Sequence, residues 1–304
     1  MKHFKLFGQK TLLLVLMLSL LFLNVQAGDK KEVNKTFKPK EIVDIKVVSG
    51  DCVIKKGNNS EIKVHLVYTY PPDKFEPVFE EKGNTLILKE EFHKTEGKCN
   101  IHGESHWTVT VPEKTNIEFK AASGDLDVAG LKSSISAKLA SGDVTVKDFK
   151  GKIKLKAASG ELNVSDSTGE MTVGAASGDI ELSNVKGTFN VKAASGDIDA
   201  SGIEFNEPSN FEAVSGEVLV KLAKSSTVDL NLKTVSGDIT LDYNGNPVKG
   251  YFKFKGMKGN IHSDIPFDNK EGSKYSPFVK KYFKKGDSPE ITLKAVSGDL
   301  TFKK

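Results

Sequence analysis

A short motif returns along the chain with a fixed spacing. Ser-Gly followed by an acidic residue recurs every 18 residues, at Ser123, Ser141, Ser159, Ser177 and Ser195. The same triplet occurs with longer intervals at Ser49, Ser215, Ser236 and Ser297, and a degenerate tenth copy is Lys258-Gly259-Asn260. A fixed period of this length is typical of a chain that stacks one structural unit on the next.

Apolar residues alternate with polar ones around each copy. They stand six, four and two positions before the Ser and three and five after it, as in Ile117, Phe119, Ala121, Leu126 and Val128. Alternation with period two predicts strands that have one buried face. Each copy is therefore expected to be a strand, a tight corner and a second strand.

A unit of this length cannot bury its apolar row alone, so successive units must stack with ~4.8 Å between strands. We predict an all-β fold: a single-stranded β-solenoid, or β-helix, with rungs of about 18 residues that follow one another in sequence order. Glycine occupies the second position of all ten copies. The recurrence of glycine predicts a structural corner that has a positive φ or too little room for a side chain. The corner glycines are Gly124, Gly142, Gly160, Gly178, Gly196, Gly216, Gly237 and Gly298.

The first 27 residues are typical of a secretory signal peptide. Three lysines precede an apolar run over residues 12–23, and Val25-Gln26-Ala27 ends in a small residue. The run is shorter than the ~20 residues that a membrane-spanning helix needs. We predict cleavage after Ala27 and export to the periplasm, the outer-membrane surface or the medium, with a retained N-terminal anchor as the alternative. No transmembrane segment is expected after cleavage.

The period also predicts domain boundaries. Residues 28–40 are rich in lysine and are expected to form a linker. Residues 41–116 contain one Ser-Gly-Asp copy and longer alternating stretches at 62–68, 86–88 and 107–111, which predicts an N-terminal β-hairpin cap and first rung. Residues 117–304 form the solenoid, with an insertion at about 263–289 that lacks the period.

Charge is balanced, and every basic side chain is a lysine. The net charge is +4, with 44 basic and 40 acidic residues and no arginine. Nucleic-acid binders concentrate positive charge, and specific phosphate or carboxylate sites favour the planar fork of arginine. The composition therefore disfavours nucleic acid as a partner and lowers the expectation of an enzyme for anionic substrates.

Two rows of charge flank the corners. An exposed acidic row stands two positions after the Ser, at Asp51, Asp125, Asp143, Glu161, Asp179, Asp197, Glu217, Asp238 and Asp299. A lysine row stands three positions before it, at Lys46, Lys120, Lys138, Lys156, Lys192, Lys233, Lys255 and Lys294. The acids are expected to accept backbone N–H bonds at the corner, with a calcium- or glycan-binding ladder as the alternative. One carboxylate per rung does not supply the six to eight oxygens that calcium needs, so we expect no metal.

Two cysteines and three histidines raise the question of a second site. Cys52 and Cys99 are a possible disulfide in an exported chain, and a buried free thiol at the inward position of Cys52 is the alternative. His93, Cys99, His102 and His106 could bind zinc, but no Cys-x-x-Cys accompanies them. Isolated surface histidines are the expectation.

The insertion is both aromatic and basic. Tyrosine and phenylalanine at 275, 278, 282 and 283 interleave with lysines at 274, 280, 281, 284 and 285. One interpretation is contact with an anionic membrane or glycan. The other is a loop or short helix that folds back over the last rungs and buries its aromatic rings.

The Ala-Ala-Ser-Gly-Asp units, the early Val-Ser-Gly-Asp and the strand Val109-Thr110-Val111-Pro112 resemble a bacterial adhesin-like family of β-strand-repeat proteins of unknown function. The resemblance spans residues 41–304. It implies a β-helical fold and an envelope or surface location, and it supplies no catalytic residues. The insertion and the two cysteines depart from the family's plain pattern.

These observations predict an exported, non-catalytic binding or adhesin-like scaffold at the cell envelope, without a cofactor. A glycan, an envelope component or a host surface component is the expected class of partner. The alternatives are a polysaccharide-active β-helix enzyme, which would need an acidic cluster that breaks the repeat, and a purely structural envelope component.

Overall fold

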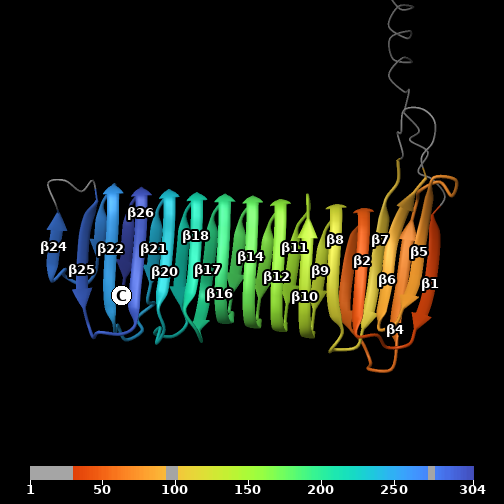
Figure 1. The fold of residues 1–304 in the computed structure, drawn as a ribbon, viewed down its shortest axis with the longest axis horizontal. Helices are drawn as coiled ribbons and strands as arrows, with labels where there is room; N and C mark the ends of the chain where they lie inside the picture. The colour runs from red at the N-terminus through yellow and green to blue at the C-terminus, as the bar shows by residue number, and fades with distance from the viewer. Residues whose placement is uncertain (1–29, 94–101, 273–277) are drawn as a thin grey trace, which may run out of the picture.

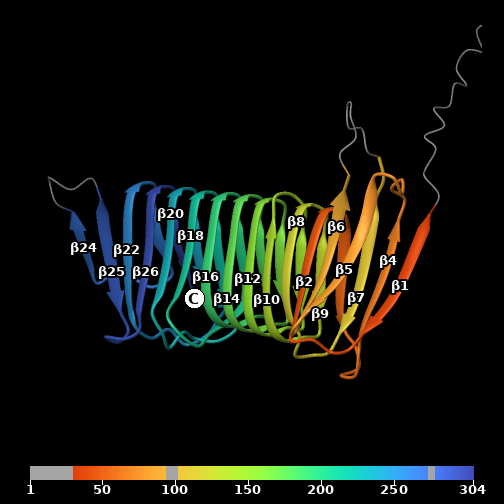
Figure 2. The same ribbon diagram turned by 45° about the vertical axis from the view of Figure 1, so that its right-hand side comes forward.

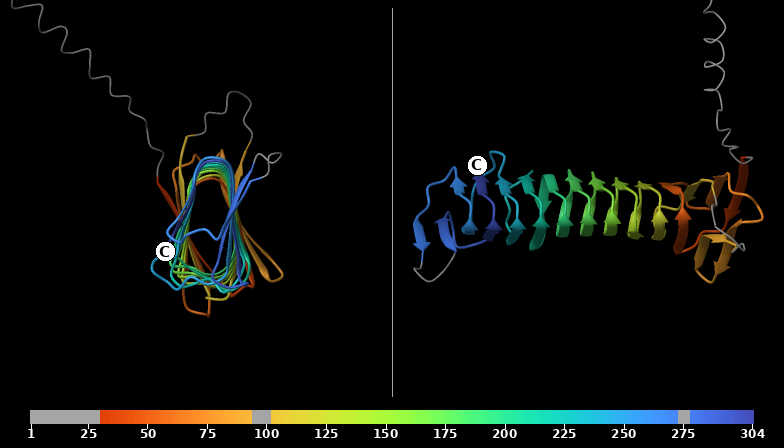
Figure 3. Two further views of the ribbon diagram at one scale, coloured as in Figure 1. Left: turned by 90° about the vertical axis from the view of Figure 1, so that its left-hand side faces the viewer. Right: turned by 90° about the horizontal axis from the view of Figure 1, so that it is seen from above.

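The structure is a computed structural model that describes residues 30–93, 102–272 and 278–304. All 27 elements in these ranges are β-strands. Figure 1 shows them stacked along one long axis, and the view along that axis in Figure 3 shows a flattened ring with two long sides. The predicted signal peptide, residues 1–27, lies outside the described residues.

The two long sides of the ring are two sheets, here called sheet A and sheet B. In stacking order from the N-terminal end, sheet B contains β5 (Phe75–Lys82), β6 (Thr85–Phe92), β2 (Ile42–Ser49), β8 (Asn116–Ser123), β10 (Lys132–Leu139), β12 (Lys150–Ser159), β14 (Thr168–Ser177), β16 (Lys186–Ser195), β18 (Ser209–Ser215), β20 (Leu230–Ser236), β26 (Glu290–Ser297), β22 (Tyr251–Lys258), β25 (Val279–Lys284) and β24 (Asn269–Gly272).

Sheet A lies opposite sheet B, and its strands also stack from the N-terminal end of the molecule. It contains β1 (Lys31–Phe37), β4 (Ile62–Tyr68), β7 (Ser105–Val111), β3 (Asp51–Lys56), β9 (Leu126–Ala129), β11 (Val144–Lys147), β13 (Leu162–Ser165), β15 (Ile180–Ser183), β17 (Ile198–Phe205), β19 (Val218–Leu222), β21 (Ile239–Asp242), β27 (Leu300–Lys303) and β23 (Ile261–Ser263).

The central strands are parallel, and their register follows the sequence period. Ile135 of β10 lies opposite Ile153 of β12, and Val144 of β11 lies opposite Leu162 of β13, an offset of 18 residues in both sheets. All four side chains are at most 1% exposed. Full burial of a Val, Leu or Ile side chain contributes roughly 1.5–3 kcal/mol, so the apolar columns between the sheets supply the main stabilisation.

The stacking order departs from the sequence order at the C-terminal end, which corrects our prediction. β26 and β27, the last strands of the chain, lie between β20–β21 and β22–β23 in both sheets. Figure 1 shows β26 between β20 and β22. The outer side of β22 is occupied by the antiparallel strand β25, with the rings of Phe252 and Phe283 stacked 4.5 Å apart. A further parallel rung therefore has no place on that side of sheet B, and the last repeat pairs on the inner side.

The prediction of a linker at residues 28–40 is also wrong over most of that range. Residues 31–37 form β1, which pairs antiparallel with β4. Val33 and Phe37 pack against the core, and the amine of Lys35 lies 4.2 Å from the centre of the Phe79 ring. Alternate residues of a lysine-rich segment thus have apolar contacts, and pairing with β4 makes the segment a strand.

The described residues of the insertion at about 263–289 include two strands, β24 and β25, where we expected a loop or short helix. β24 and β25 pair antiparallel at the C-terminal end of sheet B, and Figure 2 shows them at the opposite end of the stack from β1 and β4. Phe283 is fully buried, and Phe267 packs against the core. Residues 273–277, including Lys274 and Tyr275, lie outside the described residues.

Over the ranges that the structure describes, no helix is long and apolar enough to cross a membrane.

Candidate functional site

The corner glycines form one continuous column. The eight predicted corner glycines have φ between 115° and 146°, values that glycine adopts readily and L side chains rarely do. A Cβ on each would lie 2.0–2.3 Å from the carbonyl oxygen of the glycine in the neighbouring rung, as for Gly160 against Gly142. Both the backbone angle and the close approach therefore require glycine.

The acidic row beside this column joins the rungs. Asp125 Oδ1 accepts the backbone N–H of Asp143 at 2.9 Å, and Asp143 Oδ1 accepts that of Glu161 at 2.7 Å. The same bond, from the N–H of one rung to the aspartate of the previous rung, occurs in five further pairs: Asp51–Asp125, Asp179–Asp197, Asp197–Glu217, Asp238–Asp299 and Asp299–Asn260. We call this series the aspartate ladder. It gives most of the acidic row a structural role.

The lysine row lies on the other side of the corner, on the outward face of sheet B. Lys46 pairs with Asp44 at 2.6 Å, and Glu212 pairs with Lys192 at 2.9 Å and Lys233 at 3.4 Å. These two lysines hold the pKa of Glu212 below its ordinary value, mainly through the hydrogen bond from Lys192. Within the described residues, Lys120, Lys138 and Lys156 in the middle of the row have no such partners.

A shallow hollow interrupts the row where a rung has glycine in place of lysine. Gly174 lies between Lys156 and Lys192 in the register of β12, β14 and β16. The hollow measures about 520 Å³, and Thr172 and Asn190 are among its lining residues. Lysine, amide, hydroxyl and small apolar groups therefore meet at one place on sheet B.

A second hollow lies on the sheet A side of the corner. It measures about 410 Å³ and is lined by five carboxylates, those of Glu161, Asp179, Glu181, Asp197 and Asp199. In the described part of the chain, no group of three or more His, Cys, Asp or Glu side chains could hold a metal ion. The two sides of the corner thus carry opposite charge, and sheet B presents the positive one.

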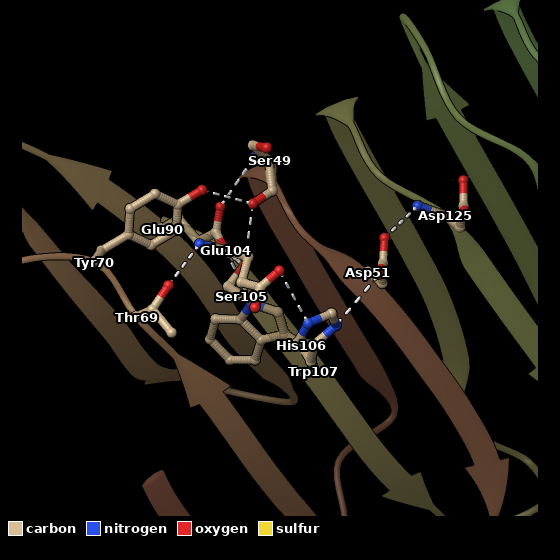
Figure 4. A network of polar contacts seen from close by, with 10 residues as sticks. All are labelled: Ser49, Asp51, Thr69, Tyr70, Glu90, Glu104, Ser105, His106, Trp107 and Asp125. Carbon is tan, nitrogen blue, oxygen red and sulfur yellow. Dashed lines mark hydrogen bonds and ion pairs between the residues drawn. The ribbon is translucent and has the colours of Figure 1, made fainter. Parts of the chain in front are cut away.

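A buried polar network closes the first corner (Figure 4). Glu90 of β6 is 7% exposed, and its carboxylate accepts the backbone N–H groups of Val48 at 2.7 Å and Ser49 at 3.3 Å. It also accepts the Trp107 indole N–H at 3.0 Å and the Ser105 hydroxyl. Four protein donors therefore occupy this carboxylate.

The position of β2 near the end of the stack explains this network. In the middle rungs, the N–H groups at the corner bond to carbonyl oxygens of the adjacent rung, as Ala140 does to Ala121 at 3.1 Å and Ser141 to Ala122 at 3.0 Å. At β2 the next strand outward is β6, and the Glu90 side chain supplies the missing acceptor. Glu90 is thus a structural group that our reading of the sequence did not single out.

Among the described residues, His93, His102 and His106 belong to no group of three or more His, Cys, Asp or Glu side chains that could hold a metal ion. His106 Nδ1 lies 3.2 Å from Asp51 Oδ2, His93 Nε2 lies 3.6 Å from Glu76, and His102 is exposed. Cys52 is a free thiol in the structure and is 1% exposed, and burial raises its pKa. Cys99 lies outside the described residues.

The fold and its corner column define a β-solenoid built from stacked Ser-Gly-acid corners. The chain belongs to the Toastrack DUF4097 family, whose model matches residues 40–251. No curated protein matches the chain in sequence.

Several solved structures resemble it. A protein of Parabacteroides distasonis, named "putative lipid binding protein", is 17% identical with a TM-score of 0.50, and the match covers 91% of this chain and 98% of that one. A "putative adhesin" of the same species is 13% identical with a TM-score of 0.49, covering 90% and 97%. A "putative adhesin" of Bacteroides fragilis is 14% identical with a TM-score of 0.42, covering 90% and 97%. At such identities, the first of these shows a shared fold.

Proposed function

We propose that the chain is an exported binding scaffold of the cell envelope, adhesin-like and without catalytic activity. The signal-peptide layout of residues 1–27 supports export. The names of the solved neighbours offer adhesion and lipid binding as two candidate activities. The surface chemistry of sheet B favours the first of these.

The observation that carries the proposal is the difference between the two charged rows. Most of the acidic row is engaged in the aspartate ladder, whereas Lys120, Lys138 and Lys156 are presented on three consecutive rungs of the outward face of sheet B. A repeated, rigid and exposed array of one charge type suits the binding of a repetitive partner rather than chemistry at one point.

We also propose a rung length and an N-terminal cap for the solenoid. Rungs of about 18 residues return one position of the array per rung, and the antiparallel strands β1, β4 and β5 act as an N-terminal hairpin cap. Solenoid ends need such protection because an unpaired parallel edge would accept strands from other chains.

The test uses the purified chain from residue 28 with a panel of acidic and neutral polysaccharides, matrix proteins and lipid vesicles. We expect reversible binding to at least one polysaccharide or matrix protein, with the ligand recovered at its original length. Cleavage of a polysaccharide that is lost when a single acidic residue is changed would show an enzyme instead. Binding to nothing in the panel would favour a purely structural envelope component.

Location needs a separate measurement. Labelling of intact cells with a membrane-impermeant reagent is expected to modify the lysines of sheet B. A chain that is labelled only after the envelope is opened would face inward, and the adhesin-like part of the proposal would be wrong.

A further inference from the structure

We infer that Lys120, Lys138 and Lys156 form a binding site for an acidic polysaccharide that lies along the solenoid axis with about one acidic group per rung. This inference rests on the proposed function and names the class of its ligand. The site comprises these three lysines, the exposed alanines beside them and the hollow at Gly174.

The three lysines form an unneutralised stack. Lys138 lies directly opposite Lys120 on one side and Lys156 on the other, and all three are exposed. No carboxylate in the described ranges pairs with any of the three amines, although Glu118 is exposed on the same face. Like charges on adjacent strands repel, so an anion bound along the row relieves an unfavourable interaction of the free protein.

Spacing selects among polyanions. Adjacent strands lie ~4.8 Å apart, and this distance sets the interval between successive lysines of the row. An extended acidic peptide presents same-face carboxylates about 6.6–6.8 Å apart, and one nucleic-acid strand carries a charge about every 3.4 Å. Neither interval matches that of the rungs, so among these polyanions we assign the stack to an acidic polysaccharide.

The flanking groups favour sugars over a lipid surface. The outward-facing residues between the lysine row and the corner are Ala122, Ala140 and Ala158, which are exposed and small. Membrane insertion needs bulky apolar or aromatic side chains, which this part of sheet B lacks among the described residues. A sugar ring can lie flat on the alanines, and beyond Lys156 the Gly174 hollow offers the Thr172 hydroxyl and the Asn190 amide to ring hydroxyls.

The test compares two triple variants of the chain from residue 28. Lys120→Gln, Lys138→Gln and Lys156→Gln remove the stack, and we expect about a tenfold loss of affinity for polygalacturonate, with binding that weakens as salt is added. The matched control changes Lys55, Lys221 and Lys303 on sheet A to Gln; these lysines make no ion pair in the described ranges. It removes the same net charge and should keep the affinity of the unchanged chain.

A single substitution guards against misfolding of the triple variant. Gly174→Glu places a carboxylate between Lys156 and Lys192, and a Cβ at Gly174 has no heavy atom closer than 3.8 Å outside its chain neighbours. We expect this variant to melt like the unchanged chain and to bind polygalacturonate more weakly.

Four outcomes would overturn the inference. If the unchanged chain binds polygalacturonate and neither variant weakens binding, the site is wrong although the proposed function stands. If both triple variants weaken it equally, attraction is general rather than local. If polyglutamate or phosphatidylglycerol vesicles bind as tightly through the same lysines, the assignment to a polysaccharide is wrong. An unchanged chain that binds no ligand at all would overturn the proposed function as well.

Discussion

At the scale of single residues, the length of one side chain decides how a rung is joined to the next. The aspartate ladder runs through Asp125 and Asp143 to Glu161, and it stops there and again at Glu217. Aspartate reaches the N–H of the following rung, whereas the glutamates at these two positions make no such bond within the described residues. The acidic row therefore contains two kinds of carboxylate that are indistinguishable by charge.

This difference predicts unequal effects of two similar substitutions. Asp143→Ala removes the acceptor of the Glu161 N–H and should lower the free energy of unfolding by about 1 kcal/mol. Glu161→Ala removes an equal charge with no ladder bond and should change it by less than about 0.5 kcal/mol. Denaturant midpoints of the two variants test this, and equal midpoints would mean that the ladder contributes nothing.

A corner glycine should matter far more than a ladder acid. Gly160 has φ +115°, and a Cβ there would lie 2.1 Å from the Gly142 carbonyl oxygen. Gly160→Val should cost more than about 3 kcal/mol, because strain at φ > 0 adds to displacement of a neighbouring rung. Asp143→Asn keeps an oxygen acceptor and is the control. Similar melting temperatures in circular dichroism would contradict the close approach of the corners.

At the scale of elements, the order of the last rungs is the main departure from the simple solenoid. β27 lies between β21 and β23, with Thr301 opposite Thr240 on one side and His262 on the other. The last repeat is thus enclosed by two others, although it ends the sequence.

Disulfide formation can test this order. Adjacent strands place their Cα atoms within the 4.4–6.8 Å that a disulfide spans, and strands two apart do not. In a Cys99→Ser background, Thr240→Cys with Thr301→Cys should cross-link on mild oxidation, whereas Thr240→Cys with His262→Cys should not. Peptide mapping by mass spectrometry distinguishes them. A cross-link in the second pair alone would mean that the rungs stack in sequence order.

At the scale of the whole molecule, many lysine–glutamate pairs tie neighbouring strands together at the surface. Glu204 pairs with Lys186 at 2.8 Å and Glu212 with Lys192 at 2.9 Å. The hydrogen bonds from these lysines are the largest cause that lowers the pKa of each glutamate below its ordinary value of 4.5. Both side chains are about a third exposed, so each pair contributes little alone.

The direction of these shifts fixes the pH dependence. A pKa that is lower in the folded state stabilises the fold above about pH 4.5, and this contribution is lost as pH falls through the lowered pKa. We expect the denaturant midpoint to be flat from pH 7 to 5 and to fall below pH 4.5. The double variant Glu204→Gln, Glu212→Gln should show a shallower fall, and an identical profile would contradict a contribution from these pairs.

The repeating part of the molecule can be predicted from local sequence patterns alone. The alternation and the 18-residue interval predict parallel strands with inward apolar columns, because pleat and stacking both act between residues at fixed local spacing. Asp or Asn also recurs at the 18-residue interval, and our predictions did not include this second pattern. Asp148, Asp166 and Asn184 adopt φ of 49–54°, the left-handed region that Asp and Asn tolerate, at the opposite corner of successive rungs.

The arrangement of the two ends depends on contacts between distant segments of the chain. Asp238 bonds to the N–H of Asp299, 61 residues later in the chain, and no local spacing encodes which of two later repeats stacks there. Likewise, Glu90 stands at a position that alternation assigns to the buried face, and only the donors that converge on it from β2 and β7 explain a carboxylate there. Contacts between distant segments settle such features, because each end must satisfy an edge that the repeat leaves open.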